Sequence, residues 1–445
     1  MTSRRDFLKQ AALGAAGVAV SSMPSFSAKS YANVKGANER IRIGAVGVNS
    51  RGAALAQNFA KMSDCSIDYI CDVDSRALNR CVASIEKQTG KKPKGEEDLR
   101  RLYEKKDLDA VIIATPDHWH ASAALMAMQA GKDVYLEKPV AYAPAEGEML
   151  IKGAAKYGRV LQVGSQRRSW PNVIEAINLV KSGEIGEVHF GKCWYTNRRA
   201  SIGHGQVVEP PKELNWDLWQ GPAPRTEYRS NLVHYNWHWF WHWGTAESLN
   251  NGMHMIDLLR WGMGVDYPTM VQSTGGRYYY EDDWQTPDTQ LINLDFGGEK
   301  SMLWEGHSCN PHRIEGESVG VLFYGEKADL LIGGGNSYKI FDKRSRVIKE
   351  KQSEVKIDPR NPMNPAQALD SIHIQNFFDG IKKGTKLNAD ITTGHISTLL
   401  MQLGNIALRT NSTLKVDPTD GHIIGNKAAQ KLWSRKYEKG WEMKL

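Results

Sequence analysis

The stretch Ile41-Arg-Ile-Gly-Ala-Val-Gly-Val-Asn-Ser-Arg-Gly52 decides the fold of this chain. It begins with an apolar run of strand length, and Gly47, Asn49 and Gly52 then occupy the three glycine positions of a G-x-G-x-x-G turn. Apolar residues at i, i+4 and i+7 follow, as on one face of a helix. Strand, turn and helix in this order predict a cradle whose backbone N–H groups and helix N-terminus face the phosphates of a dinucleotide.

A carboxylate follows at the distance that a dinucleotide fold requires. Asp72 lies about 20 residues beyond Gly52, at the end of the apolar run 67–71, where such folds place the acid that binds the adenosine ribose. Because a carboxylate repels a 2′-phosphate, Asp72 favours NAD. Arg76 lies close enough in sequence to leave NADP open.

The first residues carry an export pattern. Ser3-Arg-Arg-Asp-Phe-Leu-Lys9 precedes a weakly apolar segment, 11–20, and then small residues up to Ala28. This resembles a twin-arginine signal peptide, so we expect residues 1–30 to be signal peptide and leader of a periplasmic or otherwise exported protein. The apolar segment is too short to span a bilayer, and we expect no membrane anchor.

Composition and charge describe an ordinary globular chain. Its 445 residues are 41% hydrophobic and 24% charged, which is enough for two domains. The net charge of +7 is spread without long basic blocks, which favours a solvated surface over nucleic-acid binding. Five cysteines without a C-x-x-C pair describe neither a disulfide framework nor a zinc site.

The chain changes character near its middle. Strand-like runs at 41–46, 67–71, 110–114, 134–137 and 160–163 alternate with helical stretches, which predicts a doubly wound parallel sheet, the Rossmann type of α/β domain, over residues 38–166.

Later strand-like runs lack regular intervening helices; they lie at 187–196, 270–280, 289–296, 301–308, 319–324 and 330–332. With helical runs at 366–382 and 393–409, they predict an α+β domain over residues 167–445, with a large, mostly antiparallel open sheet.

Several motifs together carry a resemblance to a known family. They are the glycine turn, Thr115-Pro-Asp-His-Trp-His120, Glu137-Lys-Pro139, Trp216-Asp-Leu-Trp-Gln-Gly-Pro-Ala-Pro224 and Asn250-Asn-Gly-Met-His254-Met-Ile-Asp257. The chain resembles the glucose-fructose oxidoreductase / inositol dehydrogenase / MocA family of nicotinamide-dependent sugar enzymes over nearly all of its mature length. The resemblance implies an oxidoreductase acting on a hydroxyl of a sugar or sugar derivative. It also implies that the second domain, residues 167–445, binds the substrate and forms a homodimer or homotetramer through its open sheet.

The resemblance also implies the catalytic groups. Lys138 would hold the reacting hydroxyl and stabilise the developing alkoxide, and His254 would transfer the proton. Asn250, His254 and Asp257 lie at i, i+4 and i+7, which predicts one polar stripe facing a cleft. Much of the family has an aspartate four residues before the histidine. Asn250 can orient an imidazole but carries no charge, so we expect Asp257 to compensate in part.

The remaining expected site residues fall into two groups. The cofactor residues are Gly47, Asn49, Ser50, Arg51, Gly52, Asp72, Thr115, Pro116, His118, His120, Glu137, Lys138 and Gln166. The substrate residues are Lys138, Arg167, Tyr235, Trp237, His238 and His254. We expect Asn49 and Arg51 to add bonds to the pyrophosphate.

The segment His234-Tyr-Asn-Trp-His-Trp-Phe-Trp-His-Trp243 has two interpretations. Aromatic rings stack on the C–H faces of sugars, but they also pack in cores, and tryptophans at alternating positions fit both. Its histidines lie at i, i+4 and i+8, a metal triad only if the segment is helical. We expect no metal site.

Export constrains the chemistry, because nicotinamide cofactors are made and kept in the cytoplasm. We therefore expect a tightly held NAD that is reduced and re-oxidised within the protein. One alternative is a redox-neutral NAD-dependent glycoside hydrolase acting through a transient keto-sugar, and a second is a non-catalytic sugar-binding sensor. Glu137-Lys-Pro139 favours the oxidoreductase, since this motif is typical of the dehydrogenase branch and usually altered in the hydrolytic relatives.

Overall fold

Strand β1 (Ile41–Val46) lies inside a six-stranded parallel sheet of order β3-β2-β1-β4-β5-β6. This computed structural model describes residues 40–355 and 367–445, so the expected signal peptide lies outside the described residues. The other strands are β2 (Cys65–Cys71), β3 (Lys94–Glu96), β4 (Ala110–Ile113), β5 (Asp133–Leu136) and β6 (Leu161–Val163). The predicted doubly wound sheet is confirmed. The strand order reverses between β1 and β4, so the carboxyl ends of these strands border the crevice where such sheets bind ligands.

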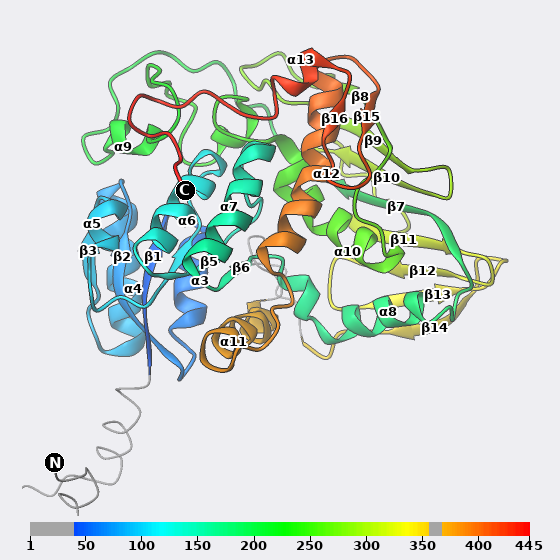
Figure 1. Cartoon of the computed structure of the whole chain (residues 1–445), viewed down its shortest axis with the longest axis horizontal. Helices are drawn as coiled ribbons and strands as arrows, with labels where there is room; N and C mark the ends of the chain where they lie inside the picture. Colours follow the sequence, from blue (N-terminus) through cyan, green and yellow to red (C-terminus); the bar gives the residue numbers. More distant parts are fainter. Residues whose placement is uncertain (1–39, 356–366) are drawn as a thin grey trace, which may run out of the picture. The chain divides into compact units, whose positions relative to one another are not determined.

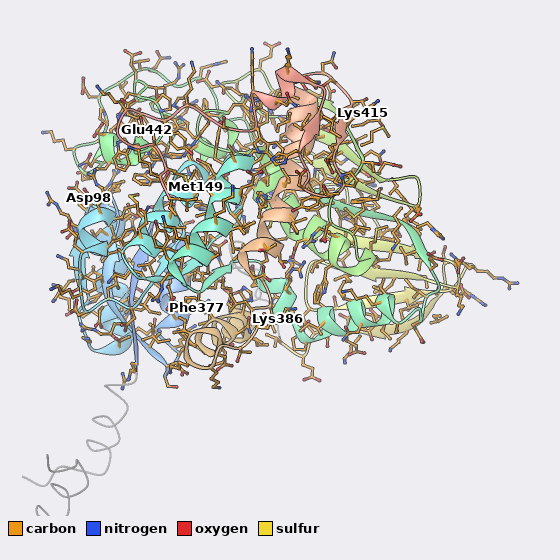
Figure 2. All side chains as sticks on the ribbon, viewed as in Figure 1. Asp98, Met149, Phe377, Lys386, Lys415 and Glu442 are labelled. Atoms are coloured by element: carbon orange, nitrogen blue, oxygen red, sulfur yellow. The ribbon has the colours of Figure 1, made fainter. Side chains whose placement is uncertain are left out.

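The helices of the first sheet follow the predicted alternation. They are α3 (Arg51–Phe59), α4 (Ser75–Thr89), α5 (Leu99–Tyr103), α6 (Asp117–Gln129) and α7 (Pro144–Tyr157). A late helix, α11 (Gln367–Lys383), packs beside α3 (Figure 1). Its Phe377, labelled in Figure 2, meets Tyr135 of β5 edge-on, with ring centroids 5.9 Å apart. A helix from the far end of the chain thus packs against the first domain.

The second sheet has ten strands in the order β14-β13-β12-β11-β7-β10-β9-β8-β15-β16. They are β7 (Val188–Thr196), β8 (Met270–Gly276), β9 (Thr289–Phe296), β10 (Lys300–His307), β11 (Val319–Gly325), β12 (Asp329–Ile332), β13 (Tyr338–Phe341), β14 (Val347–Lys351), β15 (Leu414–Val416) and β16 (Ile423–Ile424). Within the described residues of this sheet, β7 and β10 pair in parallel and the other strand pairs are antiparallel. The predicted, mostly antiparallel sheet is confirmed. Strands β13, β15 and β16 are short and were not predicted, and β14, also not predicted, is exposed along its whole length.

Two helices pack on the second sheet, and one of them also contacts the first domain. α10 (Met253–Met263) packs on β7, and α12 (Ile391–Arg409) packs on both β8 and α7 (Figure 1). A π-helical turn, η3 (Ser248–Gly252), leads directly into α10. Shorter elements are the 3-10 helices η1 (Gln166–Ser169) and η2 (Asn236–Trp239), with α8 (Pro171–Lys181), α9 (Trp216–Gln220) and α13 (Lys427–Gln430). Within the described residues, no helix combines the length and apolar character needed to span a bilayer.

Candidate active site

The glycine turn closes against the end of β4. Gly47 has a φ of +77°, and a Cβ at this position would lie 2.8 Å from the carbonyl oxygen of Ala114. A Cβ on Gly52 would lie 1.9 Å from the carbonyl oxygen of Gly47. Side chains are therefore excluded at both positions, and the backbone is left open toward a ligand. This is the cradle that the sequence predicts.

The turn borders a cavity of about 440 Å³. Of the expected site residues, the cavity brings together Gly47, Asn49, Ser50, Arg51, Asp72, Thr115, Pro116, His120, Glu137, Lys138, Gln166, Tyr235, Trp237, His238, Asn250 and His254. Gly52, His118, Arg167 and Asp257 do not line it. Residues that sequence reasoning missed include Asp117, Tyr195, Asn197, Arg199 and Asn251.

Asp72 occupies the ribose-binding position at the end of β2. Its carboxylate accepts hydrogen bonds from the backbone N–H groups of Val48 (2.6 Å) and Asp74 (2.9 Å), while burial raises its pKa. The guanidinium of Arg76 is held by Asp74, with Nε and Nη2 at 3.0 and 2.5 Å from the two carboxylate oxygens. The cation nearest in sequence to Asp72 is thus already paired, which fits NAD better than NADP.

Two buried polar atoms support the fit of a cofactor. The hydroxyl of Thr115 and the side-chain carbonyl of Gln166 are buried without a hydrogen-bond partner among the described residues, and both residues line the cavity. Buried polar groups are normally bonded, so these atoms call for a polar ligand. With the open glycine turn and Asp72, they form a set that would hold NAD.

Arg51 lines the cavity, and two of its guanidinium nitrogens bond protein carboxylates. Its Nε donates to Glu137 (2.8 Å) and its Nη1 donates to Asp370 of α11 (3.0 Å). The guanidinium is therefore directed at two protein carboxylates, although Arg51 also borders the cavity. Burial alone would raise the pKa of Glu137, but Arg51 and Lys138 hold it below its usual value. Arg51 thus fixes the Glu137-Lys-Pro139 strand end.

Lys138 and His254 both line the cavity. Lys138 Nζ donates to the backbone carbonyl of Asn250 (2.5 Å), and burial lowers the pKa of Lys138 against the opposing charges of Glu137 and Asp117. Burial, reinforced by Lys138 and Arg167, lowers the pKa of His254 well below its usual value. His254 is therefore neutral, and its Nδ1 has no hydrogen-bond partner among the described residues. A neutral imidazole has a lone pair that can accept a hydrogen bond or a proton from a ligand hydroxyl, while the charge of Lys138 opposes the imidazolium form.

The π-helical turn explains why the predicted polar stripe is wrong at its far end. Asp257 is 1% exposed and lies outside the cavity, in an ion pair with Arg168 (2.7 and 2.9 Å) and a hydrogen bond from Ser397 (2.6 Å). The i→i+5 pattern of a π-turn rotates the following residues relative to an α-helix. Asn250 and Asp257 therefore do not share one face, and Asp257 does not compensate for Asn250.

Asn250 is hydrogen-bonded to a carboxylate other than Asp257. Glu247 is 4% exposed and accepts hydrogen bonds from the side-chain amides of Asn250 (3.1 Å) and Asn251 (2.5 Å), and from Arg199 Nε (2.5 Å). Asn250 thus orients Glu247 rather than the imidazole of His254. Sequence reasoning missed Glu247. Its position three residues before Asn250 was the available clue, since such residues are neighbours on a helix.

Three other predicted residues lie beside or behind the cavity. His118 is buried, with Nε2 2.9 Å from the carbonyl of Trp219. His120 contacts the carbonyls of Thr115 and Pro139 (2.8 and 2.5 Å), and so ties two strand ends together. Arg167 has its guanidinium 4.9 Å from the ring centre of Trp170, and burial lowers its pKa to about 10.

The aromatic segment is divided between the protein core and the cavity. Trp239 is buried and stacks on Trp284 at 4.1 Å, whereas Trp237 and His238 border the cavity and stack at 3.6 Å. Its three histidines have separate partners. His234 contacts Asp74, His238 contacts the Tyr235 carbonyl, and His242 contacts the Pro224 carbonyl. The segment is a short 3-10 turn rather than an α-helix, so a metal triad does not form.

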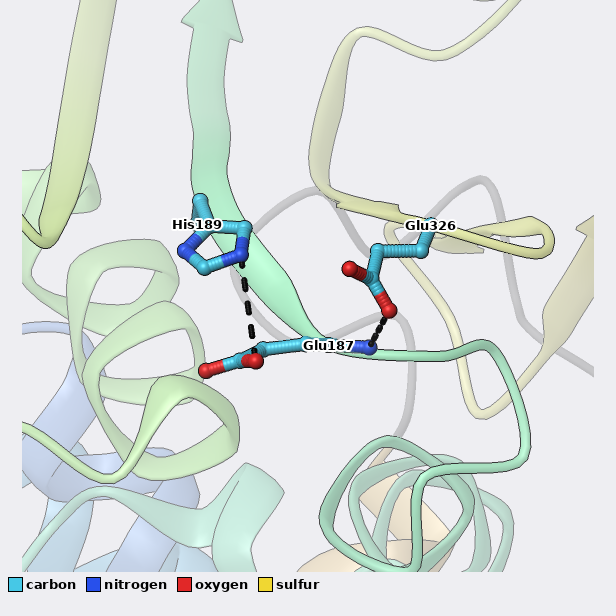
Figure 3. Close-up of side chains that lie close together, drawn as sticks. All are labelled: Glu187, His189 and Glu326. Carbon is cyan, nitrogen blue, oxygen red and sulfur yellow. Dashed lines mark hydrogen bonds and ion pairs between the residues drawn. The ribbon is translucent and has the colours of Figure 1, made fainter.

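Elsewhere in the described residues, one group of side chains has the spacing of metal ligands. Glu187, His189 and Glu326 have ligand atoms within 4.8 Å of one another (Figure 3). All three are exposed, and they lie at the start of β7 rather than at the cavity. Exposed acidic groups commonly occur without an ion, and we assign no role to this group.

A parallel nucleotide-binding sheet and a glycine cradle define a protein with an NAD-binding Rossmann domain. Two family models match the chain: the oxidoreductase family NAD-binding Rossmann fold over residues 41–165, and the C-terminal alpha/beta domain of the same family over residues 205–416. The chain belongs to the GFO/IDH/MocA oxidoreductase family, and its first domain binds NAD.

Curated relatives carry hydrolase names. The chain is 30% identical to "Glycosyl hydrolase family 109 protein 2" of Shewanella sp. (strain ANA-3) over 376 residues, which is 76% of this chain and 78% of that one. It is 28% identical to the "Alpha-N-acetylgalactosaminidase" of Shewanella oneidensis over 208 residues, 43% of this chain and 45% of that one. For several of these relatives, the match thus spans about half of their length.

Solved structures carry dehydrogenase names. The WlbA dehydrogenase from Bordetella pertussis, in complex with NADH and UDP-GlcNAcA, has a TM-score of 0.62 at 18% identity, covering 85% of this chain and 99% of that one. A putative myo-inositol dehydrogenase from Sinorhizobium meliloti has a TM-score of 0.60 at 17% identity, covering 85% and 100%. These likenesses concern the fold alone.

Proposed function

We propose that this protein is an exported, NAD-dependent enzyme that oxidises a hydroxyl of a sugar or sugar derivative while keeping its cofactor bound. The observation that carries the proposal is that Lys138 and His254 line the same cavity as the glycine turn and Asp72. Nucleotide binding and proton-transfer groups thus share one cavity, as hydride chemistry at a hydroxyl requires.

Each residue has a defined task in this proposal. The glycine turn, Asp72, Thr115 and Gln166 would hold NAD, which when bound supplies the acceptor for the hydride. Lys138 donates a hydrogen bond to the hydroxyl oxygen and stabilises its developing negative charge. Neutral His254 receives the hydroxyl proton. Glu247, with Arg199 and Asn251, positions the turn that carries Asn250.

Tight retention of the cofactor is supported by a segment of the second domain that we call the ribose strap, residues 213–219. The strap is hydrogen-bonded to the loop that follows Asp72. Ser75 N–H donates to the Glu213 carbonyl and Asn215 N–H to the Val73 carbonyl, both at 2.9 Å. His234, from the same domain, adds a 2.8 Å contact to Asp74. A dinucleotide seated at Asp72 would have to displace these contacts to leave.

The first test uses the mature protein purified without added cofactor. We expect nicotinamide absorbance that survives gel filtration and changes to the reduced form on addition of a sugar. A protein that purifies without nucleotide and exchanges NAD freely would contradict tight retention. Bound NAD that no sugar reduces would contradict the activity and support a sugar-binding sensor.

The second candidate function is a redox-neutral glycoside hydrolase. The 30% identity to a glycosyl hydrolase family 109 protein favours it, whereas Lys138 at the cavity favours the oxidoreductase. Incubating the purified protein with glycosides and no added cofactor separates the two. Free sugar released over many turnovers without net reduction of NAD identifies the hydrolase, and accumulated keto-product with reduced cofactor identifies the oxidoreductase. Export and a homodimer or homotetramer remain part of the proposal.

A further inference from the structure

His238 is held at the cavity in one orientation. Its Nδ1 lies 2.6 Å from the backbone carbonyl of Tyr235. Because a carbonyl oxygen can only accept, Nδ1 carries the hydrogen and Nε2 carries the lone pair. The ring is also stacked on Trp237, with centroids 3.6 Å apart and planes 19° from parallel. The tautomer and the ring plane are thus both set by the protein.

His238 is also held neutral. Burial lowers its pKa to about 3, and the positive charges of Lys138 and Arg199 contribute. A neutral ring with Nδ1–H engaged can offer only an acceptor at Nε2. No hydrogen bond joins Nε2 to any part of the chain that the structure describes. The cavity therefore contains a fixed acceptor that requires a donor from a ligand.

The cations at the cavity are already committed. Arg51 is paired with Glu137 and Asp370, and Arg199 is paired with Glu247. Among the described residues that line the cavity, Lys138 is the remaining cation, and its place is at the reacting hydroxyl. Arg167 does not line the cavity. A sugar carboxylate or phosphate placed at His238 would thus meet the lone pair of Nε2, while both arginines of the cavity are already neutralised by carboxylates.

We infer that His238 is a specificity-determining residue that accepts a hydrogen bond from a substrate hydroxyl, and that the substrate is an uncharged sugar ring or glycoside. This inference rests on the proposed function and names the substrate class of the same cavity. A site built to bond a hydroxyl rejects the analogue without it, because its acceptor is left unpaired.

The test measures binding to the NAD-loaded protein by calorimetry. The probes are methyl glycosides of glucose, galactose, mannose and N-acetylglucosamine, followed by the monodeoxy analogues of the best binder. We expect one deoxy analogue to bind the unchanged protein about 10-fold to 100-fold more weakly. In His238→Asn, the side-chain amide can replace the Nδ1–H donor, and the Nε2 acceptor is removed. The parent glycoside and the same deoxy analogue should then bind this variant with equal affinity. His204→Asn, at an exposed histidine paired with Asp283, is the matched control and should behave as the unchanged protein.

The uronate and the 6-phosphate of the preferred ring should each bind at least about 10-fold more weakly than the neutral glycoside. Equal or tighter binding of either anion would overturn the inference. The inference would also be overturned if removing each hydroxyl cost the same affinity in His238→Asn as in the unchanged protein. It would be overturned as well if none of the four neutral glycosides bound. If the deoxy series shows that one hydroxyl depends on His238 for its contribution to binding but no glycoside reduces the bound NAD, the inference stands and the proposed activity fails.

Discussion

The ammonium group of Lys138 donates a hydrogen bond of 2.5 Å to the backbone carbonyl of Asn250. This contact joins the end of the first sheet to the π-helical turn of the second domain. A lysine with a single neutral acceptor retains two further N–H donors, and these are available to a substrate hydroxyl. The contact thus positions Lys138 and leaves two of its N–H donors free.

We expect Lys138→Met to remove this function. The change preserves side-chain length but removes every donor, so the rate of NAD reduction at saturating sugar should fall about 100-fold to 1,000-fold, as when one charge-stabilising donor is lost. Stopped-flow absorbance of the bound nicotinamide measures the rate.

Lys132→Met is the matched control. Lys132 is also buried and donates to two backbone carbonyls, those of Lys105 and Leu108, but it does not line the cavity. This variant should lose stability and keep the reduction rate. Equal rate losses in both variants would assign the effect to folding.

Asp72→Ser should relax the preference for NAD. Removing the carboxylate removes its repulsion of a 2′-phosphate and one acceptor for the ribose hydroxyls. We expect the ratio of the two dissociation constants to move toward NADP by about 100-fold, which corresponds to about 2.7 kcal/mol. Titration of nucleotide-stripped protein with each cofactor measures the ratio, and an unchanged ratio would show that the ribose binds elsewhere.

His234→Ala should speed the loss of bound cofactor. The imidazole bonds Asp74 at 2.8 Å, beside the ribose strap, and its removal leaves the strap with fewer bonds to the first domain. We expect release to be about 10-fold faster, equivalent to about 1.4 kcal/mol. Transfer of nicotinamide to an added NAD-scavenging enzyme reports the rate. His204→Ala, at an exposed histidine, should release cofactor at the original rate.

His373 should make stability depend on pH. Its ring is fully buried between the Ser169 hydroxyl (2.7 Å) and the Val163 carbonyl (2.9 Å), and burial lowers its pKa to about 4. The unfolded chain takes up this proton near pH 6.5, before the folded protein does. The free energy of unfolding should therefore fall as the pH is lowered from about 6.5 to about 4, by about 1.4 kcal/mol per pH unit for this group.

Urea unfolding at pH 7 and pH 5 tests this dependence. In His373→Asn, the loss of stability between the two pH values should be smaller by up to about 2 kcal/mol. His189→Asn, at an exposed ring, should show the full loss. Equal losses in all three proteins would place the pH dependence in other groups.

Sequence reasoning succeeded where the requirement was local. Gly47 needs a positive φ and Gly52 a close backbone approach, and both demands are visible as glycines in a short motif. Asp72, Thr115 and Glu137 follow apolar runs, and parallel strands place their carboxyl ends at one edge. The cofactor half of the cavity was therefore largely predictable.

It failed where one turn or a distant partner decided the position. The π-helical turn moves Asp257 off the cavity and onto Arg168, a change that residue periodicity does not reveal. Arg51 donates a hydrogen bond to Asp370, 319 residues away in the sequence, a partner that the glycine motif does not reveal.

The sequence by itself determined the dinucleotide cradle and the two sheets, because backbone conformation and the alternation of strands and helices follow from short-range pattern, whereas Lys138 and His254 were expected from the family resemblance. Only the tertiary structure decided which charges remain free in the cavity. Glu247 pairs with Arg199 and Glu137 with Arg51, and His238 turns its Nδ1 to Tyr235. These choices depend on which side chains burial forces together, since a buried charge or donor must find its partner wherever the fold supplies one.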